Sequence, residues 1–265
     1  MSTPLDDAFD VMDSAWIHGY RTRSYALFSG GDDSLTATHF AMTYSHAQCV
    51  LHINTGISAK KDGKSVPLEF VKWTCAKYGW PLRVEVPPTL SYREFVLKWG
   101  FPGPGYHSVI YAWLKERAIR KVIRETKTSF RERVGLINGV RAQESTRRMG
   151  YGEAIHREGC QLWIAPLYSW SKMDCVRYIE RHGLTRSPVV ELLHMSGECL
   201  CGAFAHENEL KEIALWYPET VAEIEALQKE AEAAGKYCKW GERPPGKRER
   251  KSKFMPMCAG CAVRP

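Results

Sequence analysis

The chain has 265 residues, of which 44% are hydrophobic and 25% charged, a composition typical of globular proteins that excludes a wholly disordered chain. No apolar run reaches the roughly 20 residues that a membrane helix needs, and the first residues lack the basic and apolar regions of a secretory signal. We therefore expect a cytoplasmic protein without a membrane partner. The formal net charge of +7 favours an anionic ligand, either a nucleotide or a nucleic acid.

Apolar residues recur along the chain with the spacing of alternating strands and helices. Short apolar runs predict strands at 25–28, 48–53, 82–86, 134–138 and 162–164. Helical spacing predicts helices at about 5–18, 35–42 and 107–126, one entered at Pro67, and one opened by Ser171 and closed at Gly183. Strands that alternate with helices form a parallel sheet. We therefore predict an α/β, Rossmann-like fold with about five strands and helices on both faces.

From about residue 207 the sequence becomes helical and acidic. Its apolar stripe consists of Leu210, Ile213, Val221, Ile224 and Leu227, with an interruption at Pro218. A basic tail follows over 243–253, and a Cys-x-x-Cys pair lies close to the last residue. We therefore predict a larger domain over 1–205 and a helical, cysteine-bearing segment over 206–265 that packs on it.

The loop Ser29-Gly30-Gly31-Asp32-Asp33-Ser34 lies between the first predicted strand and the next helix. Its glycines let backbone N–H groups approach phosphate oxygens, the helix N-terminus favours an anion, and the serine hydroxyls add donors. A carboxylate does not bind phosphate directly, so Asp33 is expected to hold a Mg²⁺ ion that bridges to the phosphates. The alternative for this loop alone is a surface turn of small polar residues.

The loop resembles the SGGxDS pyrophosphate loop of the adenine-nucleotide alpha-hydrolase superfamily. Further motifs narrow the resemblance to the phosphoadenosine-phosphosulfate (PAPS) reductase family, over most of residues 20–205. They are Asn54-Thr55-Gly56, Leu114-Lys115, the G-x-R-x-x-E-S-x-x-R segment from Gly139 to Arg148, and Pro166-Leu167-Tyr168-Ser169-Trp170. Several motifs in the family's order make the resemblance specific, and it implies that 1–205 is a nucleotide-binding domain for ATP, PAPS or adenylyl sulfate.

The resemblance also implies roles for single residues. Asp33, Lys115, Arg141 and Arg148 become the candidate catalytic residues, with the arginines suited to hold phosphate or sulfate through their planar fork. The remaining candidate nucleotide contacts are Ser29, Gly30, Gly31, Asp32, Ser34, Asn54, Thr55, Gly56, Lys60, Gly139, Glu144 and Ser145. The alternative for the arginines and for Lys115 is a solvated helix face.

Two departures from the family pattern bear on function. Asp32 stands where the loop often has a lysine, which removes a positive charge beside the phosphates, and we hypothesise that Lys60 and Lys61 supply it. The Glu-Cys-Gly-Leu-His segment, whose thiol attacks sulfate in assimilatory PAPS reductases, does not occur in this sequence.

Nine cysteines in a reducing compartment favour metal ligation, reactive thiols or core packing over disulfides. Cys199 and Cys201 lie where iron-sulfur members of the family carry a cysteine pair, and Cys258 and Cys261 form a second pair. Four thiolates suit zinc or a [4Fe-4S] cluster, of which the resemblance favours the cluster. Unligated core thiols are the alternative, and Cys238 is a possible substitute ligand or sulfur-accepting thiol.

The leading functional hypothesis is an enzyme that cleaves ATP to AMP and pyrophosphate, adenylating an acceptor oxygen that a sulfur nucleophile then displaces. The DNA phosphorothioation ATPases that the chain resembles combine such a loop with an iron-sulfur cluster. A nucleic acid would contact the basic tail, and a cysteine desulfurase would supply sulfur. The alternatives are reduction of PAPS or adenylyl sulfate with thioredoxin as reductant, and a non-catalytic nucleotide-binding subunit of a sulfur-transfer or defence complex.

Overall fold

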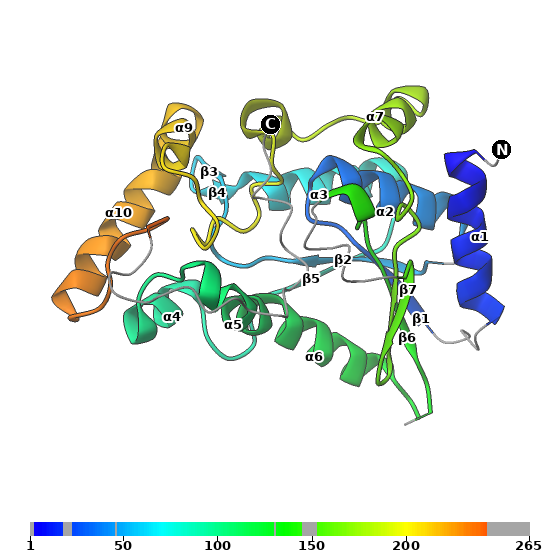
Figure 1. The fold of residues 1–265 in the computed structure, drawn as a ribbon, viewed down its shortest axis with the longest axis horizontal. Coiled ribbons are helices and arrows are strands. Elements are labelled where there is room, and N and C mark those ends of the chain that lie inside the picture. Colours follow the sequence, from blue (N-terminus) through cyan, green and yellow to red (C-terminus); the bar gives the residue numbers. More distant parts are fainter. Residues whose placement is uncertain (1–2, 18–22, 46, 130, 145–152, 243–265) are drawn as a thin grey trace.

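A sheet with helices on both faces forms the centre of the molecule (Figure 1). The computed structural model describes residues 3–17, 23–45, 47–129, 131–144 and 153–242. Within them, six strands form one sheet in the order β5-β2-β1-β6-β8-β7. The strands are β1 (Arg23–Leu27), β2 (Cys49–Ile53), β5 (Leu82–Glu85), β6 (Val134–Ile137), β7 (Ile155–Glu158) and β8 (Gln161–Ile164). A separate two-stranded hairpin pairs β3 (Lys60–Lys61) with β4 (Lys64–Ser65).

The predicted α/β fold is confirmed, and all five predicted strands are present. Neighbouring strands are parallel, except that β7 runs antiparallel to β8 at the sheet edge. The sequence did not indicate β7, because three of its four residues are exposed and polar and therefore give no apolar alternation. In register, Tyr25 of β1 lies opposite Cys49 on one side and Leu136 on the other, so β1 is central between β2 and β6.

The described helices are α1 (Pro4–Ile17), α2 (Asp32–Tyr44), α3 (Val66–Tyr78), α4 (Tyr92–Trp99), α5 (His107–Tyr111), α6 (Arg117–Thr126), α7 (Lys172–Arg181), α8 (Pro188–Leu193), α9 (Glu209–Trp216) and α10 (Pro218–Ala233). Each predicted helix is present, and the structure adds α4 and α8, which the sequence did not indicate. The predicted helix over 107–126 is α5 and α6 joined by a π-helical turn, η2 (Ala112–Glu116). The predicted capping box of Ser171 and Asp174 opens α7, with both of its hydrogen bonds formed.

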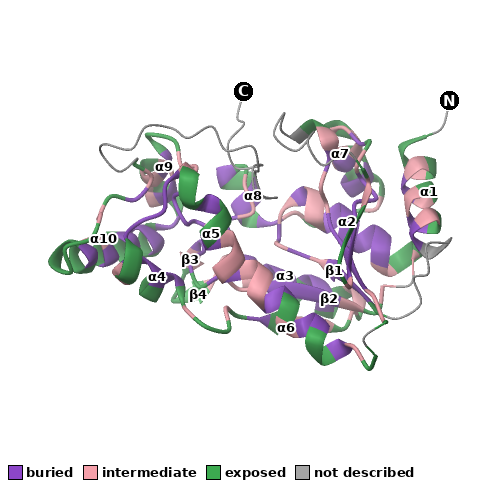
Figure 2. Ribbon diagram, turned by 60° about the horizontal axis from the view of Figure 1, so that its bottom comes forward, coloured by how far each residue is buried: buried purple, intermediate pink, exposed green. Residues whose placement is uncertain are grey.

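The two faces of the sheet carry separate cores. Side chains that alternate along the strands pack against α1, α2, α3 and α7 on one face, and against α6 on the other. Ala26 and Val50 belong to the first face, while Tyr25 and Leu51 belong to the second. Figure 2 shows β1, β2 and the inner side of α2 as buried, with exposed residues on the outer sides of the helices.

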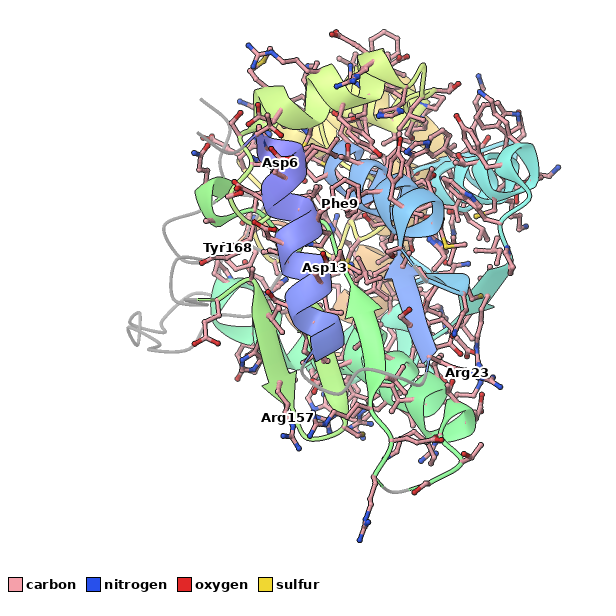
Figure 3. The ribbon with its side chains drawn as sticks, turned by 90° about the vertical axis from the view of Figure 1, so that its right-hand side faces the viewer. Asp6, Phe9, Asp13, Arg23, Arg157 and Tyr168 are labelled. Carbon is pink, nitrogen blue, oxygen red and sulfur yellow. The ribbon has the colours of Figure 1, made fainter. Side chains whose placement is uncertain are left out.

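Helix α1 covers the sheet at the end near β6 and β8 (Figure 3). Phe9 packs on Phe40 of α2 with a ring-centroid distance of 5.0 Å. The indole Nε1 of Trp170 donates to the carbonyl of Pro4 at 2.6 Å, and the hydroxyl of Ser169 donates to Asp7 at 3.0 Å. The Pro166–Trp170 segment thus holds α1 in place, which gives this family-like motif a structural role.

The C-terminal helices share a third core with the rest of the chain. Ile213, Ile224 and Leu227 pack in one cluster with residues of α4, α5 and α8, and the break between α9 and α10 falls at Pro218 as predicted. The backbone N–H of Lys60 donates to Thr220 at 2.7 Å, which ties the β3–β4 hairpin to α10. The boundary at residue 205 stays a prediction. None of the described helices has the length and apolar character needed to cross a bilayer.

A histidine between α2 and α7 makes the stability of the fold depend on pH. Nδ1 of His39 lies 2.8 Å from the hydroxyl of Tyr178, and the ring of His182 lies 5.0 Å away. Burial, with a further contribution from His182, lowers the pKa of His39 to about 4 from 6.5. The unfolded chain therefore binds a proton below pH 6.5 that the folded chain does not bind until about pH 4.

We predict that the free energy of unfolding decreases as the pH falls from about 6.5 to about 4, by about 1–3 kcal/mol from this residue. Urea unfolding across this range measures it. The His39→Gln variant loses most of this pH dependence, whereas His156→Gln, at an exposed position of β7, keeps it. An unchanged pH profile in the His39 variant would contradict the assignment.

Candidate functional site

The glycine-rich loop lies at the carboxyl end of the central strand β1 and leads directly into α2. Gly30 has a φ of +87°, which few other residues adopt. The hydroxyl of Ser34 donates to the carbonyl of Gly31 at 2.9 Å and lies 3.1 Å from the hydroxyl of Ser29, so the serines close the loop on itself. Gly31 is the N-cap of α2, and it provides no side-chain cap. The first N–H groups of α2 thus remain suited to an anion.

The loop after β6 packs against the start of α2. A Cβ atom on Gly139 would lie 2.4 Å from the carbonyl oxygen of Asp33 and 2.8 Å from the backbone nitrogen of Ser34. Only a glycine therefore allows the two loops to approach this closely. Gly139 was predicted as a nucleotide contact. In the structure, its lack of a side chain allows the loop after β6 to pack against the end of the glycine-rich loop.

Asp32 is the buried centre of a charge cluster. Its carboxylate accepts two hydrogen bonds from Arg186, at 3.0 Å to Nε and 2.8 Å to Nη2, and one from Nζ of Lys172 at 3.1 Å. The side chain of Asp32 is 1% exposed, so these cations offset the cost of burying its charge. The aspartate that departs from the family pattern thus binds two cations beside the loop.

Asp33 joins the same cluster. Its carboxylate contacts Nη2 of Arg141 at 3.1 Å through one oxygen and Nζ of Lys172 at 3.1 Å through the other. Two of the four candidate catalytic residues, Asp33 and Arg141, are therefore in direct contact. Among the described residues, three cations (Arg141, Lys172, Arg186) contact two carboxylates (Asp32, Asp33) beside the N-terminus of α2. Cations at this position favour an anion.

Sequence reasoning missed Lys172 and Arg186. They lie 140 and 154 residues from Asp32 in the chain, and no local pattern marks either of them. The one local signal is the capping box, which places Lys172 at the first turn of α7. Lys60, hypothesised to supply the missing charge, instead contacts Glu223 of α10 at 2.5 Å. Its role as a nucleotide contact stays a prediction.

The Asn54-Thr55-Gly56 motif follows β2. Asn54 accepts the backbone N–H of Gly56 at 3.0 Å in a local turn. Thr55 is buried, and its backbone N–H donates to Oε1 of Glu198 at 2.8 Å while its hydroxyl donates to the Glu198 carbonyl at 2.6 Å. Thr55 therefore joins the end of β2 to the segment that carries Cys199 and Cys201. Sequence reasoning assigned no role to Glu198.

The thiols of Cys199 and Cys201 lie next to each other. Cys201 hydrogen-bonds to the sulfur of Cys199, and this bond, together with the positive charge of Lys115, lowers the pKa of the Cys199 thiol to about 7 in spite of its burial. The hydroxyl of Tyr92 donates to the Cys201 carbonyl at 3.0 Å. The structure thus brings the candidate catalytic Lys115 to the thiol pair and favours the thiolate form of Cys199.

The segment after α10 supports the thiol pair from the other side. The indole Nε1 of Trp240 donates to the carbonyl of Leu200 at 2.8 Å. The same indole lies 2.8 Å from the position of a Cβ atom on Gly202, which has a φ of +79°. The chain therefore passes directly beside Cys199 and Cys201 shortly before its basic tail.

Some predicted site residues fall outside the described part of the chain. Ser145, Arg148, Cys258 and Cys261 lie there, and Glu144 is described only as the last residue of a short 3-10 turn (Ala142–Glu144). Within the described residues, no three metal-ligating side chains converge. Ligation by four cysteines therefore stays a prediction.

Two of the other described cysteines, Cys75 and Cys175, are buried, and burial raises the pKa of each thiol to about 12, as expected of core residues. Cys238 is half-buried and packs against the same core cluster as Cys201.

We predict that Gly139→Ala destabilises the protein by about 1–3 kcal/mol, because the added methyl group meets backbone atoms of Asp33 that cannot turn away. Chemical denaturation measures the change. Gly105→Ala is the matched control, since a Cβ atom there meets nothing within 4 Å. Equal stability of the two variants would contradict the close approach of the loops.

Comparison with known proteins identifies the family of the chain. The family model of the phosphoadenosine phosphosulfate reductase domain matches residues 23–195, more than half of the chain. Among solved structures, the chain is similar to phosphoadenylyl-sulfate (PAPS) reductase from Candida auris in its phosphate complex, with a TM-score of 0.48 and 18% identity over 70% of this chain and 84% of that chain. No curated protein matches. The loop, the motifs and the matched residues together show that the chain belongs to the phosphoadenosine phosphosulfate reductase family.

Proposed function

We propose that the protein is an ATP pyrophosphatase that adenylates an acceptor for sulfur transfer. The observation that carries the proposal is the cluster of Arg141, Lys172 and Arg186 at the start of α2. An acceptor oxygen attacks the α-phosphorus, the bond between the α-phosphorus and the bridging oxygen breaks, and pyrophosphate leaves. Cations placed beside the leaving group stabilise the charge that develops on it.

Lys172 is the cation best suited to bind the phosphates of the nucleotide. Its side chain is 50% exposed and bridges Asp32 and Asp33 with single contacts, whereas Arg186 is held by two hydrogen bonds to one buried carboxylate. A flexible lysine can move from a carboxylate to a phosphate at small cost. Arg141 and Arg186 then keep the aspartates neutralised while Lys172 binds pyrophosphate.

The carboxylate of Asp33 fits the predicted role of magnesium ligand. It is slightly exposed, and its two oxygens contact Arg141 and Lys172, so a Mg²⁺ ion would take the place of at least one of these cations. Bound Mg²⁺ would supply further positive charge to the pyrophosphate. Its binding would release Lys172 from the Asp33 carboxylate.

Cys199 and Cys201 fit two of the four ligands of a [4Fe-4S] cluster or a zinc ion. They lie in hydrogen-bonding contact, and the pKa of the Cys199 thiol is lowered toward the thiolate that metals bind. Cys258 and Cys261 would complete the set. An iron-sulfur cluster would supply electrons for the sulfur chemistry, whereas a zinc ion would hold the segment with Cys199 and Cys201 in place. A nucleic acid bound by the basic tail is the proposed acceptor.

We predict that the full-length protein releases pyrophosphate from ATP in the presence of Mg²⁺, and that Lys172→Met lowers kcat/KM for this release by about 10- to 100-fold. The reason is the loss of one charge-assisted hydrogen bond to the leaving group, worth about 1.5–3 kcal/mol. A coupled phosphate assay after pyrophosphatase treatment, run with DNA and RNA as acceptors, measures the rate.

Lys229→Met is the matched control, because Lys229 is exposed on α10. The control keeps the wild-type rate. Binding of ATP with no pyrophosphate release under any condition would overturn the enzyme and favour a non-catalytic nucleotide-binding subunit.

A second function is favoured by the thiol pair. In this alternative the chain reduces PAPS or adenylyl sulfate, and Cys199 is the nucleophile because its thiol has a pKa of about 7. The Cys199 sulfur attacks the sulfur of the sulfate group, and the nucleotide leaves with the bridging oxygen. The Cys201 thiolate then attacks the Cys199 sulfur, sulfite leaves, and a disulfide forms. A dithiol protein such as thioredoxin reduces the disulfide.

The reductase alternative predicts sulfite release from PAPS or adenylyl sulfate when thioredoxin is present, and at least a 100-fold loss in Cys199→Ser. A sulfite-specific colorimetric assay measures it. Cys160→Ser, at a half-buried thiol beside the β6 face, is the control and keeps the activity. Sulfite release that persists in Cys199→Ser would exclude this thiol as the nucleophile.

A further inference from the structure

A single buried carboxylate connects the nucleotide loop with the thiol pair. Glu198 is 1% exposed and immediately precedes Cys199. Its Oε1 atom accepts the backbone N–H of Thr55 at 2.8 Å, and its Oε2 atom lies 3.2 Å from Nε2 of His52. His52 lies in β2 and Thr55 just after it; the Thr55 contact is a hydrogen bond, whereas the His52 contact is a close approach between two buried polar atoms.

His52 extends the connection to the nucleotide loop. It is fully buried in β2, and its Nδ1 atom donates to the carbonyl of Phe28 at 2.8 Å. Phe28 is the residue directly before Ser29 of the loop. An unbroken chain of contacts therefore runs from the base of the phosphate loop through His52 and Glu198 to the residue next to Cys199.

Backbone contacts hold the same segment in place. The N–H of Ala59 donates to the carbonyl of Gly197 at 2.9 Å, and the N–H of Leu200 donates to Ile57 at 3.0 Å. Ser196 lies beside the loop, with its Cβ atom 3.3 Å from the position of a Cβ atom on Gly31. The segment of residues 196–201 thus lies against the nucleotide loop at one end and carries the thiol pair at the other.

We propose that Glu198 is a positioning residue through which nucleotide binding at the 29–34 loop controls the reactivity of Cys199. The proposal rests on nucleotide binding by that loop, but not on the reaction that follows. An anion that rearranges the loop shifts the Phe28 carbonyl, and His52 and Glu198 with it, because these buried side chains are in contact and the hydrogen bonds of His52 to Phe28 and of Thr55 to Glu198 would otherwise break.

The test measures the rate at which iodoacetamide alkylates Cys199 in the full-length protein, by mass spectrometry of the Cys199 peptide. The probe is α,β-methylene ATP with Mg²⁺, which cannot be cleaved between the α and β phosphates. We expect saturating probe to slow alkylation at least threefold in the wild type. If the preparation holds a metal at the thiols, the rate of metal transfer to a chelator is measured instead, since it also requires the Cys199 sulfur to be exposed.

Two substitutions distinguish an effect transmitted through Glu198 from direct shielding of Cys199 by the bound nucleotide. Glu198→Ala removes both contacts, and the probe effect is expected to disappear. Glu198→Gln keeps the shape of the side chain and can still accept the backbone N–H of Thr55, so the effect is expected to remain within about twofold of the wild type. Shielding of Cys199 by the nucleotide itself would persist in both variants and would overturn the proposal. Loss of the effect in both would assign it to charge and overturn the hydrogen-bonded link.

Glu209→Ala is the matched control. Glu209 is also buried and lies near a histidine, with its carboxylate 3.8 Å from Nε2 of His206, but it belongs to α9. It should leave the probe effect unchanged. Where Glu198→Ala fails to fold, Thr55→Val removes the hydroxyl bond to the Glu198 carbonyl at nearly constant shape, and the probe effect should fall by at least half.

The outcomes for this proposal and for the proposed function are separable. If the protein releases pyrophosphate but the probe does not change the alkylation rate of Cys199, the proposed link through Glu198 is wrong and the proposed enzyme activity is retained. If the probe changes the alkylation rate of Cys199 but no pyrophosphate is released, the link through Glu198 is retained and the proposed pyrophosphatase activity is wrong. Absence of probe binding, measured by calorimetry, overturns both.

Discussion

The buried carboxylate of Asp32 is the constraint on which the site depends. A charge at this depth is stable only when it is paired and hydrogen-bonded, and here the partners come from the start of α7 and from the residues before α8. The segment of residues 172–186 must therefore dock onto the start of α2. The same docking brings Lys172 to Asp33, beside the start of α2.

The central position of β1 explains why the site forms where it does. Loops after β2, β1 and β6 leave the same edge of the sheet, and β1 lies between the other two strands. The chain leaves β1 toward β2 and later returns to β6 on the other side, which is the arrangement that opens a crevice in α/β sheets. Glycine at position 139 then allows the β6 loop to lie against the start of α2.

The thiol pair is supported by parts of the chain that lie far from it in sequence. Glu198 is bound by residues at the end of β2, Tyr92 of α4 holds the Cys201 carbonyl, and Trp240 holds the Leu200 carbonyl. Tyr92 and Trp240 belong to the third core, which α4, α5 and the C-terminal helices share. The C-terminal part is thus integral to the thiol site, and its contacts with the β3–β4 hairpin extend the same connection.

The alternating fold, the position of the glycine-rich loop and the capping of α7 could be predicted from the sequence, because they depend on local periodicity, glycine conformation and side chains three residues apart. The sequence could not reveal β7, whose polar residues carry no pattern, nor the partners of Asp32. The contacts of Lys172 and Arg186 with Asp32, which replaces the family's loop lysine, became visible only in the folded structure. The same holds for the contact of Lys60 with Glu223. The physical reason is that ion pairs depend on which chain segments the core brings together, and no local pattern encodes contacts across 140 residues or more.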